Sequence, residues 1–343
     1  MVAELATSFA AAGCPGVVFL PRDGEGWLGR ELAGAGVAIE YVRFGRMISR
    51  RFASDLAAAF RAHHVNIAHS HEFTMGVYGA WAARSAGVPH MITMHGGRYY
   101  ASAWHRRLAL RLAVRASGPL VAVSTELAAH LTHDLGVKAE RVTVIPNGVR
   151  ERPLPARTLR DELGLGSDAP LLVAMGNLYP VKGHRHLINA LAAVASQHPH
   201  VHLAIAGRGE CEAALRAQAT ALGVAARVHL LGFRADIETL LGGADLFVHP
   251  SLAEGLPLAI LEAMFAARPI IASAVGEIPE ALGGEGVLVE PGDDAALAAA
   301  IDRLLRDSVG ARALGGRAQI RARATYALAQ SVERYAALIA ASL

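Results

Sequence analysis

Short apolar runs alternate with longer amphipathic stretches along the first half of the chain. Buried strands that alternate with amphipathic helices are typical of doubly wound parallel α/β sheets. The pattern therefore predicts a Rossmann-like α/β domain over residues 1–150, with strands at 16–20, 37–42, 66–70, 90–94, 119–123 and 142–145.

The same alternation starts again in the second half. It predicts a second Rossmann-like domain over 151–325, with strands at 171–175, 202–206, 228–231, 245–249, 269–273 and 286–289. The proline-containing segment 145–170 has no strand pattern and is interpreted as a linker. Residues 326–343 are amphipathic and are expected to pack back on the first domain. We thus predict two domains that face each other across a cleft.

Length and composition agree with a two-domain globular protein. The chain has 343 residues, and domains contain about 100 to 200 residues each. No apolar run reaches the roughly 18 residues that a membrane span needs. The first residues carry Glu4 and no basic segment, so they do not resemble a signal peptide. Cys14 and Cys211 stand alone, as in a reducing compartment. A cytoplasmic protein is therefore expected.

Positive charge gathers in the first half, with 16 Lys and Arg against 10 Asp and Glu up to residue 150 and 17 against 20 after it. It concentrates at 43–51 and 98–115, where Arg107, Arg111 and Arg115 recur every four residues. Three interpretations stay open: an interfacial helix on anionic lipid at the inner membrane face, a site for an anionic acceptor, or a solvated basic face. Nucleic acid is disfavoured because no binding motif accompanies the charge.

Several common catalytic motifs are absent from the sequence. It contains no G-x-x-x-x-G-K-[ST], no H-E-x-x-H, no G-x-S-x-G and no D-x-D. The loop at Gly207 and Gly209 lacks the third glycine of a dinucleotide fingerprint, and it follows the second strand of its domain instead of the first. Phosphate-loop hydrolysis, zinc proteolysis, serine hydrolysis and nicotinamide chemistry are therefore disfavoured.

The segment 251–269 is the richest in candidate chemistry. Pro257 is expected to be the first residue of a helix. The free N–H groups at that helix start would favour phosphate or sugar oxygens; they belong to Gly255, Leu256 and Leu258.

Two glutamates in this segment stand eight residues apart. Glu254 precedes the predicted helix and Glu262 lies within it among apolar neighbours. They could contact two ends of one ligand of about the length of a nucleotide-sugar. The alternative is a capping glutamate and an ordinary glutamate on a solvated face.

These glutamates, in EGLPLAILEAMFAARPIIASAVGEIPEAL, resemble the donor-site motif of the retaining glycosyltransferases of sequence family 4, which have the GT-B fold. Further segments follow the family's order over nearly the whole chain: HSHE at 69–72, TMHGG at 93–97, VAVSTELAAHL at 121–131, VTVIPNGV at 142–149, MGNLYPVKGHRHLINAL at 175–191, HLAIAGRGE at 202–210 and LGFRADIETLLGGADLFVHPS at 231–251. The resemblance implies a first domain for the acceptor and a second for the donor.

The resemblance also implies the chemistry. A sugar would move from a nucleoside diphosphate sugar to a carbohydrate, lipid-linked or small-molecule acceptor, with retention of configuration, as in polysaccharide or glycolipid biosynthesis. No metal and no further cofactor is expected. Lys182 matches the lysine on the donor diphosphate, where its charge stabilises the leaving group. The family usually has Arg where this sequence has Asn177, a neutral residue in the same phosphate clamp.

Other residues match the donor site by position. Glu254 corresponds to the residue that binds the sugar hydroxyls, Glu262 to the one that binds the ribose, and His95 to a histidine of the first domain at the sugar. His95, Lys182 and Glu254 are the expected catalytic set. The remaining donor-site candidates are Gly176, Asn177, Gly207, Phe233, Arg234, Gly255, Leu256, Pro257 and Leu258. Weaker candidates on the acceptor side are His71, Arg98 and Arg107.

The start of the chain departs from the family pattern. Family members begin with a strand and a glycine-rich turn, whereas Met1 stands at the helix that normally follows them. We therefore expect the first strand of the N-terminal domain to be missing here and the natural start to lie upstream. Two other functions stay open. One is an impaired or non-catalytic sugar-nucleotide-binding paralogue, and the other is a GT-B nucleotide-sugar 2-epimerase, which is not expected to carry the Glu254 and Glu262 motif.

Overall fold

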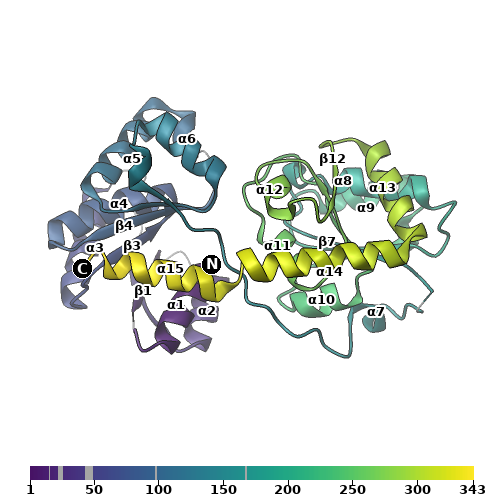
Figure 1. The fold of residues 1–343 in the computed structure, drawn as a ribbon, viewed down its shortest axis with the longest axis horizontal. Helices are drawn as coiled ribbons and strands as arrows, with labels where there is room; N and C mark the ends of the chain where they lie inside the picture. Colours follow the sequence, from purple (N-terminus) through teal and green to yellow (C-terminus); the bar gives the residue numbers. More distant parts are fainter. Residues whose placement is uncertain (15, 22–25, 43–48, 97–98, 167) are drawn as a thin grey trace. The chain divides into compact units, whose positions relative to one another are not determined.

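The computed structural model describes residues 1–14, 16–21, 26–42, 49–96, 99–166 and 168–343. Contacts divide the chain into two compact units: unit 1 contains 1–148 and 328–343, and unit 2 contains 149–327. Both are parallel α/β units, and each of the twelve predicted strands is present among the described residues. The predicted fold class is therefore confirmed (Figure 1).

The strands of unit 1 form two separate ladders. β1 (Val17–Pro21) pairs with β2 (Ala38–Val42), and the four-stranded sheet has the order β3 (Ala68–His71), β4 (His90–Met94), β5 (Leu120–Ala122) and β6 (Val142–Val144). Within the described residues, no strand joins the two ladders. The outer strands of each ladder therefore have one edge without a strand partner among the described residues. The expectation that the first strand of this domain is missing stays a prediction.

Helices cover both faces of the four-stranded sheet. The helices of unit 1 are α1 (Val2–Ala11), α2 (Trp27–Gly34), α3 (Arg50–Ala62), α4 (Glu72–Ala86), α5 (Trp104–Ala116), α6 (Thr125–Leu135) and α15 (Leu328–Ala340). One core cluster joins α4, α5 and α6 to β4 and β5. Another places Tyr335 of α15, fully buried, against Met91 and Val121. Figure 1 shows α15, in yellow, among the purple and blue elements of this unit.

Unit 2 contains one six-stranded sheet in a doubly wound order. The order is β12 (Val287–Val289), β11 (Ile270–Ser273), β10 (Leu246–His249), β7 (Leu171–Met175), β8 (His202–Ala206) and β9 (Val228–Gly232). The first strand of the unit, β7, therefore pairs with the fourth, β10. In open parallel sheets this change of winding direction is where ligands bind, at the carboxyl ends of the strands.

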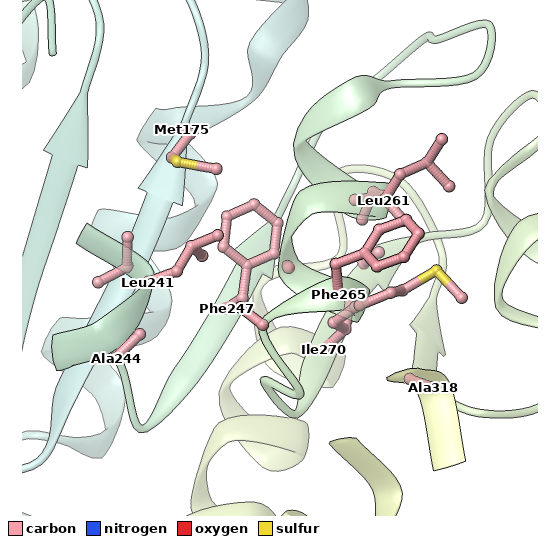
Figure 2. Close-up of a cluster of buried hydrophobic side chains, with 14 of the residues drawn as sticks. Met175, Leu241, Ala244, Phe247, Leu261, Phe265, Ile270 and Ala318 are labelled. Carbon is pink, nitrogen blue, oxygen red and sulfur yellow. The ribbon is translucent and has the colours of Figure 1, made fainter. Parts of the chain in front are cut away.

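The helices of unit 2 enclose its sheet. They are α7 (Leu159–Glu162), α8 (His184–Val194), α9 (Glu212–Ala221), α10 (Ile237–Gly243), α11 (Leu258–Phe265), α12 (Ile278–Leu282), α13 (Asp294–Arg306) and α14 (Ser308–Thr325). Figure 2 shows Phe247 of β10 between Met175 of β7 and the α11 residues Leu261 and Phe265. This cluster fixes β7, β10 and α11 to one another, and these are the elements that carry the candidate donor residues.

The segment interpreted from the sequence as a linker is partly folded into unit 2. α7 lies within it and begins with a capping box in which Thr158 and Asp161 satisfy each other's backbone N–H groups. Leu159 is fully buried in the core of unit 2. The sequence analysis missed this helix because a single turn is too short to show the helical period of hydrophobic residues.

None of the described helices is long and apolar enough to span a bilayer.

Phe247→Ala should lower the free energy of unfolding of unit 2 by about 3–5 kcal/mol, because a large side chain with no exposed surface leaves a cavity that the packed elements cannot fill. Urea denaturation of both variants measures the loss. The control is Val309→Ala, which removes a side chain that is 71% exposed and should change stability by no more than about 0.5 kcal/mol. Equal losses in the two variants would contradict the packing described here.

Candidate functional site

Two loops meet at the carboxyl edge of unit 2, one after β7 and one after β10. Lys182 ends the short 3₁₀ helix η3 (Pro180–Lys182), and Glu254 lies between β10 and α11. The Nζ of Lys182 donates to Oε1 of Glu254 at 2.5 Å. Residues 72 positions apart in the sequence therefore meet because β7 and β10 are neighbours in the sheet.

A glycine allows the backbones of these two loops to approach each other closely. Gly183 has φ +66°, and a Cβ on it would lie 2.0 Å from the carbonyl oxygen of Pro250. The N–H of Leu252 donates to the carbonyl of Val181 at 2.8 Å across the same contact. Only glycine combines this φ with such a close backbone approach. The position of Lys182 is thus fixed by backbone packing and does not depend on its own long side chain.

Glu254 is held ionised by three donors. Besides Lys182, the hydroxyl of Ser251 donates to Oε1 at 2.7 Å, and Nε2 of His249 lies 3.0 Å from the same oxygen. Burial opposes the charge, but the hydrogen bonds from His249, Lys182 and Ser251 outweigh it and lower the pKa of Glu254 to about 2. At neutral pH, unit 2 therefore presents a carboxylate and an ammonium group in direct contact.

Helix α11 begins at Leu258, one residue later than the sequence predicts, because Pro257 is its N-cap. Leu258 is thus the first residue whose N–H has no intrahelical acceptor. Glu262 lies one turn inside the helix and is half-buried, between the fully buried Leu261 and Ala263. The segment before the helix packs closely, since a Cβ on Gly276 would lie 2.4 Å from the carbonyl oxygen of Glu254.

The loops after β7 and β8 also touch. A Cβ on Gly207 would lie 1.9 Å from the carbonyl oxygen of Gly176, so only glycine fits there. Asn177 is exposed beside this contact. His184 places Nε2 3.3 Å from the carbonyl of Gly176, and its buried Nδ1 has no hydrogen-bond partner among the described residues. Burial lowers the pKa of His184 to about 4, so it is neutral at neutral pH.

Phe233 and Arg234 follow β9 but differ in their surroundings. Phe233 is 50% exposed, and the guanidinium of Arg208 lies 5.6 Å from the centre of its ring, as in a cation–π contact. Arg234 forms ion pairs with Asp236 at 2.5 Å and Glu162 at 2.9 Å. The structure therefore leaves the Phe233 ring accessible to a flat ligand group and engages the Arg234 side chain within the protein.

In unit 1, His71 and His95 come together at the carboxyl edge of β3 and β4. The planes of the two rings are 17° apart, and Nδ1 of His71 lies 2.8 Å from Nε2 of His95. Nδ1 of His95 lies 3.1 Å from Oδ1 of Asn147. Burial lowers the pKa of His95 to about 4, although the Asn147 contact favours the charged form. Burial, and then the charges of His69 and His95, also hold the pKa of His71 well below its usual value.

Glu72 fixes the backbone beside His95. Its carboxylate accepts from the His95 N–H at 3.0 Å, and its own φ is +67°. A left-handed conformation in a non-glycine residue costs about 1–3 kcal/mol and is concentrated at functional positions. Burial raises the pKa of Glu72, and hydrogen bonds from the His95 and Phe73 N–H groups oppose that effect.

The acceptor-side candidates are only partly placed. His71 contacts His95 as above, and Arg107 is exposed on α5, away from that pair in the sequence. Arg98 lies outside the described residues. Among the described residues there is no group of three or more His, Cys, Asp or Glu side chains arranged to hold a metal ion.

The sequence analysis did not identify four residues that the structure adds to these clusters: His249, Ser251, Glu72 and Asn147. His249 and Ser251 directly precede the Glu254 loop, so their place at the end of a predicted strand was the available signal. Asn147 lies in the segment 142–149 that resembles the family, but its contact with His95 joins residues 52 positions apart, so the sequence assigned it no role.

Comparison with known families covers both units. Residues 169–307 match the family model described as "Glycosyl transferases group 1", and residues 1–148 match the "Glycosyl transferase 4-like domain". The chain is 30% identical over 298 residues to alpha-maltose-1-phosphate synthase of Mycolicibacterium smegmatis, covering 76% of this chain and 75% of that protein.

Two further proteins are similar. One is UDP-Gal:alpha-D-GlcNAc-diphosphoundecaprenol alpha-1,3-galactosyltransferase of Escherichia coli, 32% identical over 61% of this chain, although the match spans only 58% of that relative. The other is Anabaena Alr3699/HepE, solved in complex with UDP-glucose, with 25% identity, a TM-score of 0.85 and coverage of 99% of this chain and 94% of that one.

Glu254→Gln should remove a pH-dependent part of the stability. The folded-state pKa of Glu254, about 2, lies below the reference value of 4.5, so its ionised contacts stabilise the fold above pH 4.5 and are lost as the pH falls toward 2. The stability gap between wild type and Glu254→Gln should therefore shrink over that range, by at most about 3 kcal/mol.

Urea denaturation at several pH values measures the gap. Glu290→Gln, at an exposed position, is the matched control and should differ from wild type by a small amount at every pH. A gap for Glu254→Gln that stays constant from pH 5 to pH 2 would contradict the ionised pairing.

Proposed function

The chain belongs to the glycosyl transferases group 1 family and has the GT-B fold, and we propose that it moves a sugar from a nucleoside diphosphate sugar to an acceptor with retention of configuration. The observation that carries this proposal is the contact of Lys182 with Glu254 at the carboxyl edge between β7 and β10. It joins a cation suited to a diphosphate and an anion suited to sugar hydroxyls, at the edge where doubly wound sheets bind ligands.

Lys182 is proposed to bind the donor diphosphate. An ammonium there stabilises the negative charge that develops on the leaving group, without a metal ion. Glu254 does not depend on Lys182 alone, since His249 and Ser251 donate to the same carboxylate oxygen. Lys182 can therefore turn to a phosphate while Glu254 stays ionised and hydrogen-bonded. Asn177 adds hydrogen-bonding capacity to this clamp but no charge.

The rest of the donor is assigned by position. Glu254 would accept hydrogen bonds from the sugar hydroxyls, helped by the N–H groups of Gly255 and Leu256. Glu262 would bind the ribose, and the segment at Phe233 would lie beside the base. His95 would contact the sugar as a neutral imidazole, because its burial disfavours the charged form.

The acceptor is proposed to be a carbohydrate or lipid-linked molecule, and the protein to be cytoplasmic. Support for the acceptor class comes from the Escherichia coli relative, whose name specifies a diphosphoundecaprenol-linked acceptor. Support for the location comes from Cys14 and Cys211, which are both free thiols.

A sugar-nucleotide-binding protein without turnover is the second candidate. Asn177 favours it, because a neutral residue in the phosphate clamp weakens stabilisation of the leaving group. Turnover distinguishes this candidate from the transferase. A nucleotide-sugar 2-epimerase would instead be identified by an epimerised product.

Calorimetric titration with UDP, GDP and ADP tests the donor site directly. One nucleotide should bind saturably, and Lys182→Ala and Glu262→Ala should each weaken it about 10- to 100-fold, since hydrogen bonds to charged groups contribute about 1.5–3 kcal/mol. The matched controls are Lys138→Ala and Glu290→Ala, both at exposed positions, which should bind like wild type. Equal weakening in variants and controls, or no binding by a folded chain, would refute the assignment.

Turnover tests the chemistry. With the nucleotide sugar of the base that binds, transfer should continue in excess EDTA, and NMR of the first-formed product should show the anomeric configuration of the donor.

His95→Ala should lower kcat about 100-fold or more, as for loss of a group that stabilises the transition state. It should leave the affinity for the nucleoside diphosphate unchanged, because the proposed ribose and base contacts are in unit 2. An inverted product would overturn the retaining mechanism, and abolition by EDTA would overturn metal independence.

A further inference from the structure

Helix α5 carries two parallel rows of exposed side chains. Trp104, Leu108 and Leu112 expose 71%, 47% and 48% of their surface and recur every four residues. Beside them runs a row of exposed arginines, Arg107, Arg111 and Arg115. Residues four apart lie on one face of a helix, separated by about 6 Å along its axis. Each row is thus about 12 Å long.

The apolar row is not needed to hold the helix in place. α5 already buries Leu110, Ala113 and Val114 against the core of unit 1. Trp104, Leu108 and Leu112 lie on the other side of the helix, where an ordinary solvated face would be polar. Contiguous exposed apolar side chains flanked by charge mark an interaction surface.

The charge on α5 itself is of one sign. The sequence of α5, WHRRLALRLAVRA, contains no acidic residue. On the neighbouring α6, the side chain of Asp134 is only 8% exposed, and Glu126, in the first turn of that helix, is exposed. Arg111 leans toward the C-terminal end of α6, where its Nη2 lies 3.4 Å from the Cβ position of Gly136. Arg107 and Arg115 are therefore the arginines that project most freely.

We propose that α5 lies flat on an anionic lipid bilayer, with the Trp104, Leu108 and Leu112 row in the interfacial region and the arginine row on the lipid phosphates. The arrangement matches the chemical layers of a membrane surface, because the apolar and cationic side chains project at adjacent angles from one helix. Tryptophan is enriched at that depth in membrane proteins. A soluble polyanion would match the arginines but leave the apolar row in water.

The position of α5 links this surface to the candidate site of unit 1. Trp104 begins the helix nine residues after His95, and His95 directly follows β4. A helix that returns along a parallel sheet starts at the carboxyl edge of the preceding strand. The surface therefore begins at the edge where His95 lies, so lipid attachment would bring a lipid-linked acceptor toward that edge. The proposed attachment of α5 to lipid does not depend on which sugar is transferred.

Vesicle flotation tests the proposal with the full chain. Wild type should float with vesicles of 70% phosphatidylcholine and 30% phosphatidylglycerol at low salt, and not with phosphatidylcholine alone. Leu108→Gln combined with Leu112→Gln, and separately Arg107→Gln combined with Arg115→Gln, should each reduce the bound fraction at least about fivefold. Such a loss corresponds to about 1 kcal/mol, the contribution of a single arginine near an anionic surface.

Matched controls come from α14 in unit 2. Val309→Gln combined with Ile320→Gln removes two apolar side chains that are 71% and 68% exposed, and Arg312→Gln removes an exposed arginine. Both should float like wild type. All the substituted positions are at the surface, and thermal melting of each variant confirms that it is folded.

Three results would overturn the proposal: wild type that stays with the soluble fraction, α5 variants that float as well as wild type, or equal binding to neutral vesicles. Size-exclusion chromatography tests the alternative that a second copy of the chain binds to the apolar row of α5. A wild-type dimer that becomes monomeric in Leu108→Gln with Leu112→Gln would show that a second copy of the chain covers the row, and would also overturn it. Because flotation requires no donor, its outcome is independent of sugar transfer.

Discussion

Parallel strand pairing is the constraint on which both candidate sites depend. Every strand pair in the described part of the chain is parallel, so paired strands end at the same edge of their sheet, and the loops after them meet there. In unit 2 the doubly wound order makes neighbours of β7 and β10, which brings Lys182 to Glu254. In unit 1 the pairing of β3 with β4 brings His71 to His95. The chemistry of each unit is thus assembled by topology.

The two units differ in the charge of the candidate side chains at these edges. Unit 2 keeps Glu254 ionised because three donors converge on one oxygen and outweigh the cost of its burial. In unit 1, burial lowers the pKa of His71 and His95, so both rings are neutral at neutral pH. For the proposed transfer, this division places fixed charge in the unit assigned to the donor diphosphate. The neutral hydrogen-bonding groups are in the unit assigned to the acceptor.

The strands could be predicted from the sequence because most are short apolar runs bounded by helical patterns, and each predicted strand is present among the described residues. Lys182, Glu254 and Glu262 could be selected as candidates because they lie in contiguous segments that resemble the family's motifs. The helix at 159–162 was missed because a single turn is too short to show a helical period of hydrophobic residues. Pro257 was placed inside α11 because an N-cap residue and a first helical residue differ only in their backbone angles. His249, Ser251 and Glu72 were not selected, although they lie in segments that resemble the family, because their roles consist of hydrogen bonds that only the folded structure shows.

The sequence alone thus determined the α/β class, the twelve strands and the candidate residues of both units, since these follow from local hydrophobic periodicity and contiguous motifs. Only the tertiary structure decided which of those residues touch and in which protonation state. Those properties depend on strand order, on the close backbone approaches at Gly183 and Gly207, and on burial. It also decided that Trp104, Leu108 and Leu112 are exposed: apolar residues on a helix predict a buried face, and only packing shows which side of α5 the core already fills.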